Sequence, residues 1–420
     1  MPRELQHTEQ TTRSFLPGAQ RVIVSLLWSG ILGVIAVRPW VIDRPEGVAL
    51  AERIGLGVGI LWCLGRLRGR PRIPAQWAIA FMCLLAALTL ASPASLDHQA
   101  AWLQKIELVF GITLCVSILL ADPTHRRQLQ MVLTITGALL SLYAIWQRVV
   151  LFPALTDFPW SELVTTGPWR NIPVHTAEFA ATVIARRRVF GPFPLPGLLA
   201  SALVMLLPIS VDTLRGWATT PARRLFTSVV WGLQGTALLL TQSLGGLVSV
   251  GAATLIVLIR RGRQRRPALQ VLGITLVAIG MLLVLRPELS QLSHPRNPVA
   301  QRWRYWMSTV DMIRDHPVRG LGAANYASAY PRYRKPLATD TRFAHNALLQ
   351  VWAEWGLLGL LGMVMLIAGS LQRAARARME YDIAVWAFWL MALIDIAWCV
   401  PQLTVLWWSV LGLAATSESG

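Results

Sequence analysis

The chain has 420 residues, of which 54% are hydrophobic and only 14% are charged. A soluble domain usually carries about 25% charged residues, so this composition and a mean hydropathy of +0.50 exclude an ordinary soluble protein. Apolar runs of roughly 18–20 residues recur along the chain, and a helix of that length crosses the hydrocarbon core of a membrane. We therefore predict an all-α, polytopic membrane protein.

The net charge of +18 comes from 39 basic and 21 acidic residues, and an excess of this size is also typical of nucleic-acid-binding proteins. Here the arginines collect in short loops between apolar runs, so we predict no nucleic-acid partner. No histidine or cysteine spacing suits a metal, and we expect neither a metal site nor a cofactor. The cysteines all lie inside apolar runs, where small apolar side chains are usual: Cys63, Cys83, Cys115 and Cys399.

In chain order, about twelve segments are predicted to span the membrane. They are residues 20–37, 47–65, 74–92, 103–121, 129–152, 195–213, 225–242, 244–260, 267–285, 346–370, 382–400 and 402–416. Residues 1–19 form a polar segment on the cytoplasmic side, and the first span is expected to be retained because no small-residue cleavage site follows it. Residues 20–285 then hold spans one to nine, 286–345 form a large outer loop, and 346–420 hold the last three spans and a short cytoplasmic tail.

The distribution of arginine predicts the orientation. Arginine collects in cytoplasmic loops, and five basic loops alternate here with short loops that have none, although Arg38 and Arg44 near the first outer loop are an exception. The basic loops are residues 66–72, 122–127, 213–224, 260–266 and 373–378. We therefore predict cytoplasmic N- and C-termini and two long outer connections, at 153–194 and 286–345.

The second outer loop is strongly basic. Residues 286–345 carry ten cations and four anions, a net charge of +6. A loop of about 60 residues is uncommon unless it is functional, and arginine matches phosphate oxygens with two parallel hydrogen bonds. The loop therefore suits an anionic partner at the outer leaflet, with a solvated basic loop as the alternative.

A histidine stands where this loop meets the next apolar run. In TRFAHNALLQVWAEWGLLGLLG (341–362), His345 and Asn346 are followed after nine residues by Gly356 and after two more by Gly359. A histidine in this position is either an interfacial side chain without a role or the group that performs the chemistry.

The segment before it adds a second pattern. RWRYWMSTVDMIRDHPVRGLGAANYASAY (302–330) combines a helical Arg302–Trp306 spacing, a Gly320–Gly322 turn and a later tyrosine, Tyr326. Together with the H-N-x9-G-x-x-G pattern, this block resembles the O-antigen ligase and O-antigen polymerase superfamily of bacterial membrane glycosyltransferases. The resemblance is sharpest over residues 302–360.

A further region fits the family and extends the set of candidate residues. In RRRVFGPFPLPG (186–197), Arg188 lies three residues before Gly191, as a family arginine precedes a glycine and a proline-flanked span. Arg186 and Arg187, the two residues before it, are alternatives for this family position.

One position departs from the family. In LLLTQSLGGLVSV (238–250), Leu244 stands where the family commonly has the arginine of a Ser-Arg-Gly turn. Either this protein lacks that charge, which would make it an impaired or inactive relative, or a neighbour from the loop 286–345 supplies it.

The resemblance implies transfer of a glycan from an undecaprenyl-pyrophosphate carrier to an acceptor hydroxyl, without a metal, at the bacterial inner membrane. His345 is the candidate base, because a sugar hydroxyl is a poor nucleophile and the helix N-terminus favours a neutral imidazole. Arg188 and Arg302 are the candidate cations for the pyrophosphate, and Asn346 either orients the acceptor or caps the helix.

Other residues are further candidates for the site. Arg304 and Arg187 are additional cations, and Tyr326 belongs to the family-like block. Glu354 and Asp395 lie within predicted spans, where carboxylates usually face inward and either line a channel or are paired.

The sequence leaves the acceptor open among lipid A-core, a glycan repeat unit and a protein. These would make the protein an O-antigen ligase, a polymerase or a protein O-oligosaccharyltransferase. A transporter-like relative is the alternative of another class.

Overall fold

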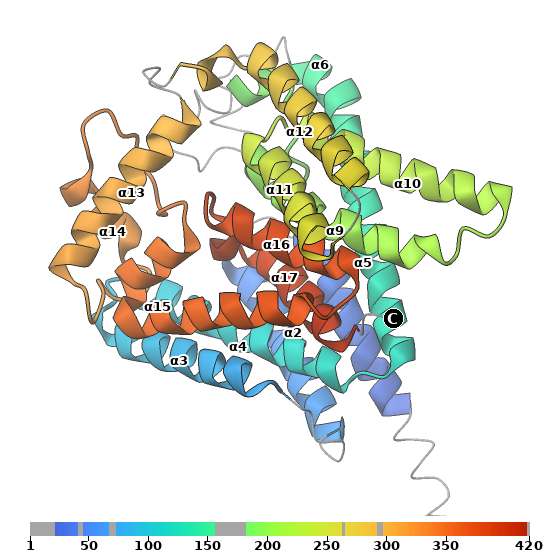
Figure 1. Ribbon diagram of the computed structural model, residues 1–420. Coiled ribbons are helices and arrows are strands. Elements are labelled where there is room, and N and C mark those ends of the chain that lie inside the picture. The colour runs from blue at the N-terminus through green and yellow to red at the C-terminus, as the bar shows by residue number, and fades with distance from the viewer. Residues whose placement is uncertain are drawn as a thin grey trace, which may run out of the picture.

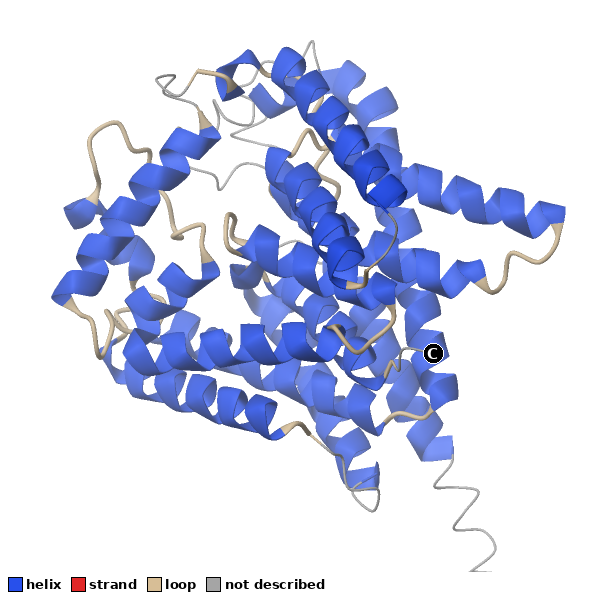
Figure 2. Ribbon diagram, in the orientation of Figure 1, coloured by secondary structure: helices blue, strands red, loops and turns tan. Residues whose placement is uncertain are grey.

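The computed structural model describes residues 22–40, 45–66, 73–155, 182–262, 265–291 and 297–417. Over these residues the chain forms helices and turns and no strand, which confirms the all-α class (Figure 2). The predicted cytoplasmic segment 1–19 and most of the outer connection 153–194 lie outside the described residues.

Each of the twelve predicted spans overlaps a helix, although the helix of the eleventh span ends at Ala392, well before the predicted end of that span at residue 400. The first is Val22–Trp40. The others are α2 (Pro45–Arg66), α3 (Ala75–Ala91), α4 (His98–Leu120), α5 (Pro123–Trp146), α9 (Pro196–Arg215), α10 (Pro221–Leu240), α11 (Leu244–Arg260), α12 (Arg265–Leu285), α15 (Ala347–Ala374), α16 (Met379–Ala392) and α17 (Pro401–Thr416). The short helix α6 (Phe152–Leu155) extends α5, and the stretch 286–345 contains α13 (Pro298–Asp315) and α14 (Tyr326–Tyr333).

Within the described part of the chain, seven helices are long and apolar enough to cross a membrane. The protein is therefore a multi-pass membrane protein. Several other helices are short, because α11, α16 and α17 have 17, 14 and 16 residues. The total of twelve spans stays a prediction.

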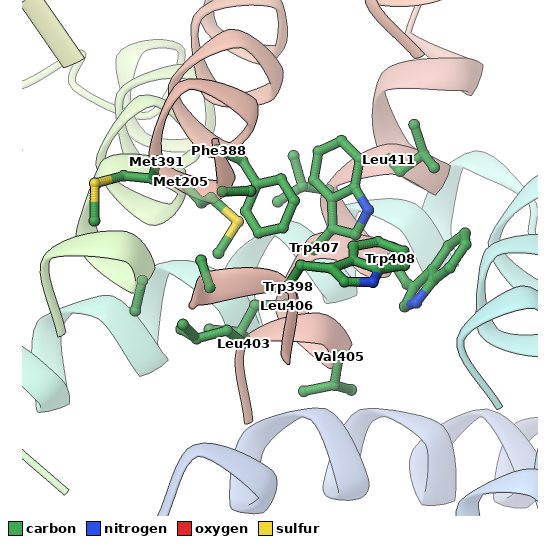
Figure 3. Close-up of a cluster of buried hydrophobic side chains, with 14 of the residues drawn as sticks. Met205, Phe388, Met391, Trp398, Leu403, Val405, Leu406, Trp407, Trp408 and Leu411 are labelled. Carbon is green, nitrogen blue, oxygen red and sulfur yellow. The ribbon is translucent and has the colours of Figure 1, made fainter. Parts of the chain in front are cut away.

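Three helices form the centre of the bundle, α9, α16 and α17. Of the apolar window in α9, 72% is buried, whereas in α12 only 6% is buried. A helix that is apolar on all sides must lie in a core or face lipid, and Figure 1 shows α12 along the outside of the molecule. In the centre, Phe388 of α16 stacks on Trp407 of α17 with ring centroids 4.3 Å apart, next to Trp408 and Met205 (Figure 3).

At one end of these central helices, ion pairs connect helix ends that carry arginines. Asp382, fully buried in the first turn of α16, pairs with Arg260 and Arg261 at the end of α11. Asp212 of α9 pairs at 2.8 Å with Arg378, which lies just before α16. Buried carboxylates need such partners. Three of the loops predicted to be cytoplasmic therefore meet at the same end of the bundle, and the C-terminal end of α16 lies away from them.

The first glycine of the H-N-x9-G-x-x-G pattern interrupts α15. Gly356 has φ 71° and ψ −165°, which breaks the helix locally. The segment before α14 bonds to the backbone on both sides of this break, because Leu321 N donates to Ala353 O at 2.7 Å and Leu357 N donates to Val318 O at 3.1 Å. The break therefore fastens the segment between α13 and α14 to α15.

We expect Gly356→Ala to destabilise the protein. A Cβ at this position would lie 2.1 Å from Val318 O, and the positive φ disfavours any other residue. The cost should exceed about 1 kcal/mol, visible as a lower melting temperature in detergent. Gly273→Ala in α12, where the space beside the glycine is open, is the control. Equal melting temperatures for the two variants would contradict this role of Gly356.

Candidate functional site

The site begins at the start of α15, where His345 and Asn346 connect the loop to the helix. Asn346 is the N-cap, since its Oδ1 accepts from Leu349 N at 3.1 Å. Its Nδ2 donates to Leu393 O, just after α16, at 2.9 Å. The amide therefore caps α15 and ties it to the end of α16. His345 precedes this cap with φ 54°, so a single tight turn fixes the direction of its ring.

One carboxylate joins three segments of the chain. Asp395, three residues after α16, is buried with 6% of its surface exposed. Its Oδ1 lies 3.3 Å from His345 Nδ1, and its Oδ2 accepts from Arg302 Nη2 of α13 at 2.9 Å. Ile396 N also donates to Oδ1 at 2.8 Å. A buried carboxylate with cationic and amide donors is held ionised and fixed in direction. Asp395 therefore brings His345 and Arg302 into one arrangement.

The histidine ring is held on a second side by α13. Tyr305 stacks on it with ring centroids 5.3 Å apart and planes at 26°, and Trp306 Nε1 donates to His345 O at 3.3 Å. The side chain is 19% exposed. Asp395 lies at ion-pair distance from Nδ1, which has no hydrogen-bond partner among the described residues. With the proton on Nδ1, Nε2 is left as the acceptor. His345 can therefore take a proton from a ligand through Nε2.

A second group of cations surrounds the turn between α10 and α11. Arg188 donates through Nε to Thr241 O at 3.2 Å and through Nη2 to Gln242 O at 3.4 Å. Arg286, just after α12, donates through Nη1 to the same Gln242 oxygen at 3.1 Å. Burial, and then the charge of Arg286, lower the pKa of Arg188. Two buried guanidinium groups thus lie together beside the turn that precedes Leu244, the position at which the resemblance led us to expect an arginine.

Glu288 partly neutralises this group. It pairs with Arg186 and, at 2.9 Å, with Arg286 Nε. Burial alone would raise its pKa, but the hydrogen bonds, first of all that from Arg186, outweigh this and lower the pKa of Glu288 to about 2. The carboxylate is therefore charged at neutral pH.

The two groups form one region with excess positive charge. After burial, the charge of Arg302 is among the causes that lower the pKa of Arg188 and of Arg286, so the arginines act on one another. Four guanidinium groups, those of Arg186, Arg188, Arg286 and Arg302, share two carboxylates, which leaves a net charge of +2. Excess charge in a low-dielectric site is unfavourable unless an anion joins it. The region therefore favours an anion of two or more negative charges.

The structure places the further candidates around these groups. Arg187 is exposed with φ 48°, and its carbonyl accepts from Arg148 at 2.7 Å. Arg304 is half-buried on α13, and its Nη1 has no hydrogen-bond partner. Both are cations at the margin of the region, and in the part of the chain that the structure describes neither forms an ion pair with Asp395.

Tyr326 and Glu354 belong to the joint between α14 and α15. Tyr326 is fully buried, and its hydroxyl lies 2.8 Å from Thr309 Oγ1. Its backbone N donates to Glu354 Oε1 at 3.0 Å. Tyr326 therefore has a packing role in this structure, whereas Glu354 also lines a cavity.

Sequence reasoning missed two members of the region, Arg286 and Glu288, and treated Asp395 only as an intramembrane carboxylate. The available signal for Arg286 was its position directly after the apolar run 267–285, at the start of the basic loop. No sequence pattern joins Asp395 to His345, because 50 residues separate them.

Comparison with known families adds an independent finding. Residues 228–364 match the family model described as O-antigen ligase. This part of the chain is therefore similar to the O-antigen ligase family. This confirms the resemblance seen in the sequence, and the matched range includes His345, Arg302 and Arg286, whereas Arg188 and Asp395 lie outside it. No curated protein matches the chain.

We expect Glu288→Gln to strengthen anion binding by the arginine region. The substitution removes a negative charge and raises the local net charge, so inorganic pyrophosphate should raise the melting temperature more than in the unchanged protein. The unliganded variant should melt at a lower temperature, because Arg186 and Arg286 lose their partner.

Asp311→Asn on α13 is the matched control, since Asp311 pairs with Lys335 and Arg314 in the same loop. An equal response to pyrophosphate in both variants would argue against an anion at the arginines.

Proposed function

We propose that the protein is a membrane glycosyltransferase that moves a glycan from undecaprenyl pyrophosphate to an acceptor hydroxyl. The O-antigen ligase domain and the multi-pass architecture support the general class. The observation that carries the reaction is the shared carboxylate of Asp395, which places His345 beside a partly buried arginine region of net charge +2. No metal takes part in the proposed reaction.

In this proposal His345 acts as the general base. Its Nε2 accepts the proton of the acceptor hydroxyl while that oxygen attacks the anomeric carbon. The new C–O bond forms as the bond from that carbon to the pyrophosphate oxygen breaks, and the configuration inverts. Asp395 holds the ring and stabilises the imidazolium, as a carboxylate does in a catalytic triad. A positioned base contributes about 10²–10⁴-fold to the rate.

In this proposal the arginines bind the pyrophosphate leaving group. Negative charge grows on the pyrophosphate as its bond to the sugar breaks, and fixed cations aimed at that charge lower the barrier. Arg302 is central, because it contacts Asp395 and lies close enough to Arg188 and Arg286 to lower their pKa values, after the effect of burial. Protonation of His345 and departure of the pyrophosphate are thereby linked through one carboxylate.

The same arrangement supports an orientation in the membrane. The arginine-rich ends of α9 and α11 share one end of the bundle, and such ends usually face the cytoplasm. His345 and Asp395 lie at the start of α15 and after the end of α16, away from those ends. We propose that the site faces outward at the bacterial inner membrane and that both termini are cytoplasmic.

His345→Ala should lower the release of undecaprenyl pyrophosphate at least 10²-fold. Asp395→Asn should lower it too, because the amide neither orients the imidazolium nor neutralises Arg302. The measurement uses the purified protein in liposomes with a lipid-linked glycan, an acceptor and a chelator. His316→Ala, which changes an exposed histidine at the end of α13, should leave the rate unchanged. Full activity in His345→Ala would remove this residue from the mechanism.

In this proposal Arg286 supplies the positive charge that Leu244 lacks. Moving the charge from position 286 to position 244 tests this. Arg286→Ala should lower the rate about 10²–10³-fold, as expected for the loss of one fixed group that stabilises developing charge. Adding Leu244→Arg should restore part of the rate, because it returns a cation to the same turn. Arg334→Ala, an exposed arginine paired with Asp340, is the control. An unchanged rate in Arg286→Ala would show that Leu244 is not compensated from this position.

A further inference from the structure

The end of α5 departs from α-helical geometry. From Gln147 to Leu151 the chain forms a π-helical turn, η3, in which Phe152 N donates to Gln147 O, five residues earlier. Such turns are rare in proteins and occur frequently at functional sites. Gln147 is only 1% exposed, and a buried amide side chain needs hydrogen-bond partners.

The side chain of Gln147 finds these partners in the loop that follows the arginines 186–188. Its Oε1 accepts from Gly191 N at 2.9 Å and from Phe190 N at 3.2 Å, and its Nε2 donates to Gly191 O at 3.0 Å. One amide therefore satisfies both backbone groups of Gly191. This glycine has φ 60°, a conformation that other residues rarely adopt, so the amide fixes the loop at its sharpest bend.

The π turn explains how α5 contacts this loop with two side chains. Phe152 packs on Phe190 with ring centroids 5.9 Å apart. In an α-helix of 3.6 residues per turn, side chains five residues apart point about 140° away from each other. The hydrogen bond of a π turn links residues i and i+5 and brings them to the same side of the helix. Gln147 and Phe152 can therefore both face residues 190–191.

Two other groups hold the beginning of the same loop. Arg148 Nη1 donates to Arg186 O at 3.0 Å and to Arg187 O at 2.7 Å. From the turn between α10 and α11, Gln242 Nε2 donates to Arg186 O at 3.3 Å. The backbone of Arg188 thus lies between two fixed points, one formed by Arg148 and Gln242 and the other by Gln147.

The loop needs these attachments because the arginines repel one another. Arg186 and Arg188 lie beside Arg286 and Arg302, and the four share two carboxylates. The repulsion favours movement of the loop away from the other cations. Gln147 opposes this movement with a neutral amide, which leaves the excess positive charge of the region available to an anion.

We propose that Gln147 and the π turn of α5 are a positioning device that aims Arg188 at a diphosphate group. The inference rests on the proposed function, because it explains how an arginine that binds the leaving group is held. Gln147 acts on the ligand only through the loop. Its effect on diphosphate binding should therefore depend on the presence of Arg188.

Gln147→Leu tests this role, because leucine has a similar volume and removes all three hydrogen bonds. Inorganic pyrophosphate should bind this variant about 5- to 10-fold more weakly, as expected when about one net hydrogen bond is lost. Binding is measured on the purified full chain by isothermal titration calorimetry. Gln147→Asn keeps an amide that is too short to reach the loop, and it should show the same loss if the leucine variant does not fold.

Gln130→Leu is the matched control. Gln130 lies on the same helix, α5, and its amide donates to the hydroxyl of Tyr381. The substitution removes a hydrogen bond between membrane helices and should lower the melting temperature of the protein. Because this contact involves none of the four arginines, the affinity for pyrophosphate should stay unchanged.

A double-mutant cycle distinguishes positioning from support of the fold. In an Arg188→Ala background, Gln147→Leu should change the pyrophosphate affinity by less than about 2-fold, because the guanidinium group that it positions is absent. A residue that only supports the fold would weaken binding equally in both backgrounds. An equal loss in both backgrounds overturns the proposal.

These measurements do not depend on glycan transfer. If the unchanged protein transfers no glycan but Gln147→Leu weakens pyrophosphate binding only when Arg188 is present, the proposed transfer is wrong and the positioning role stands. If pyrophosphate binds the variant and the unchanged protein equally, or binds neither, the positioning role is wrong whatever the transfer assay shows.

Discussion

The buried carboxylate of Asp395 is the contact on which the site depends. It lies between His345 Nδ1, in the turn before α15, and Arg302 Nη2 of α13, and it comes itself from the segment after α16. Without a carboxylate at this point, α13 would lose its charged attachment to the bundle and the ring of His345 would lose its fixed orientation. The cost of burying a charge explains why the three segments meet so closely, because Asp395 is stable only when its cationic partners are present.

The balance of charge differs between the two ends of the bundle. At one end, Asp382 and Asp212 neutralise arginines from α11 and from the segment before α16, so that end is closed by balanced ion pairs. Near His345 the balance is incomplete, since four guanidinium groups share two carboxylates. The cavity that Glu354 lines has the reverse character, with two carboxylates and no basic residue among its described walls.

Much of the fold was predictable from the sequence, because membrane helices are apolar runs of a fixed length. Each predicted span contains a helix, and Asn346 caps α15 at the predicted start. The break at Gly356 was visible only as a glycine in a pattern, since its positive φ and its contact with Val318 depend on the segment before α14. The number of membrane-spanning helices was harder to predict. The helices α16 and α17 are short and lie in the centre of the bundle, so their apolar composition reflects burial against neighbouring helices. For the site, His345 and Arg302 were predicted together, whereas Arg286 and Glu288 were not.

The sequence by itself determined the all-helical membrane character, the basic stretch 286–345 and the family resemblance, because each depends on composition or on residues close together in the chain. Only the tertiary structure decided which charges meet. Asp395 is 50 residues from His345 and 93 from Arg302, and Arg286 reaches the carbonyl of Gln242 across 44 residues. Hydrophobic periodicity determines which residues form a helix, but it does not determine which other helices pack against it. Which helix ends come together depends on the packing of whole helices, and that packing places the carboxylate between the histidine and the arginine.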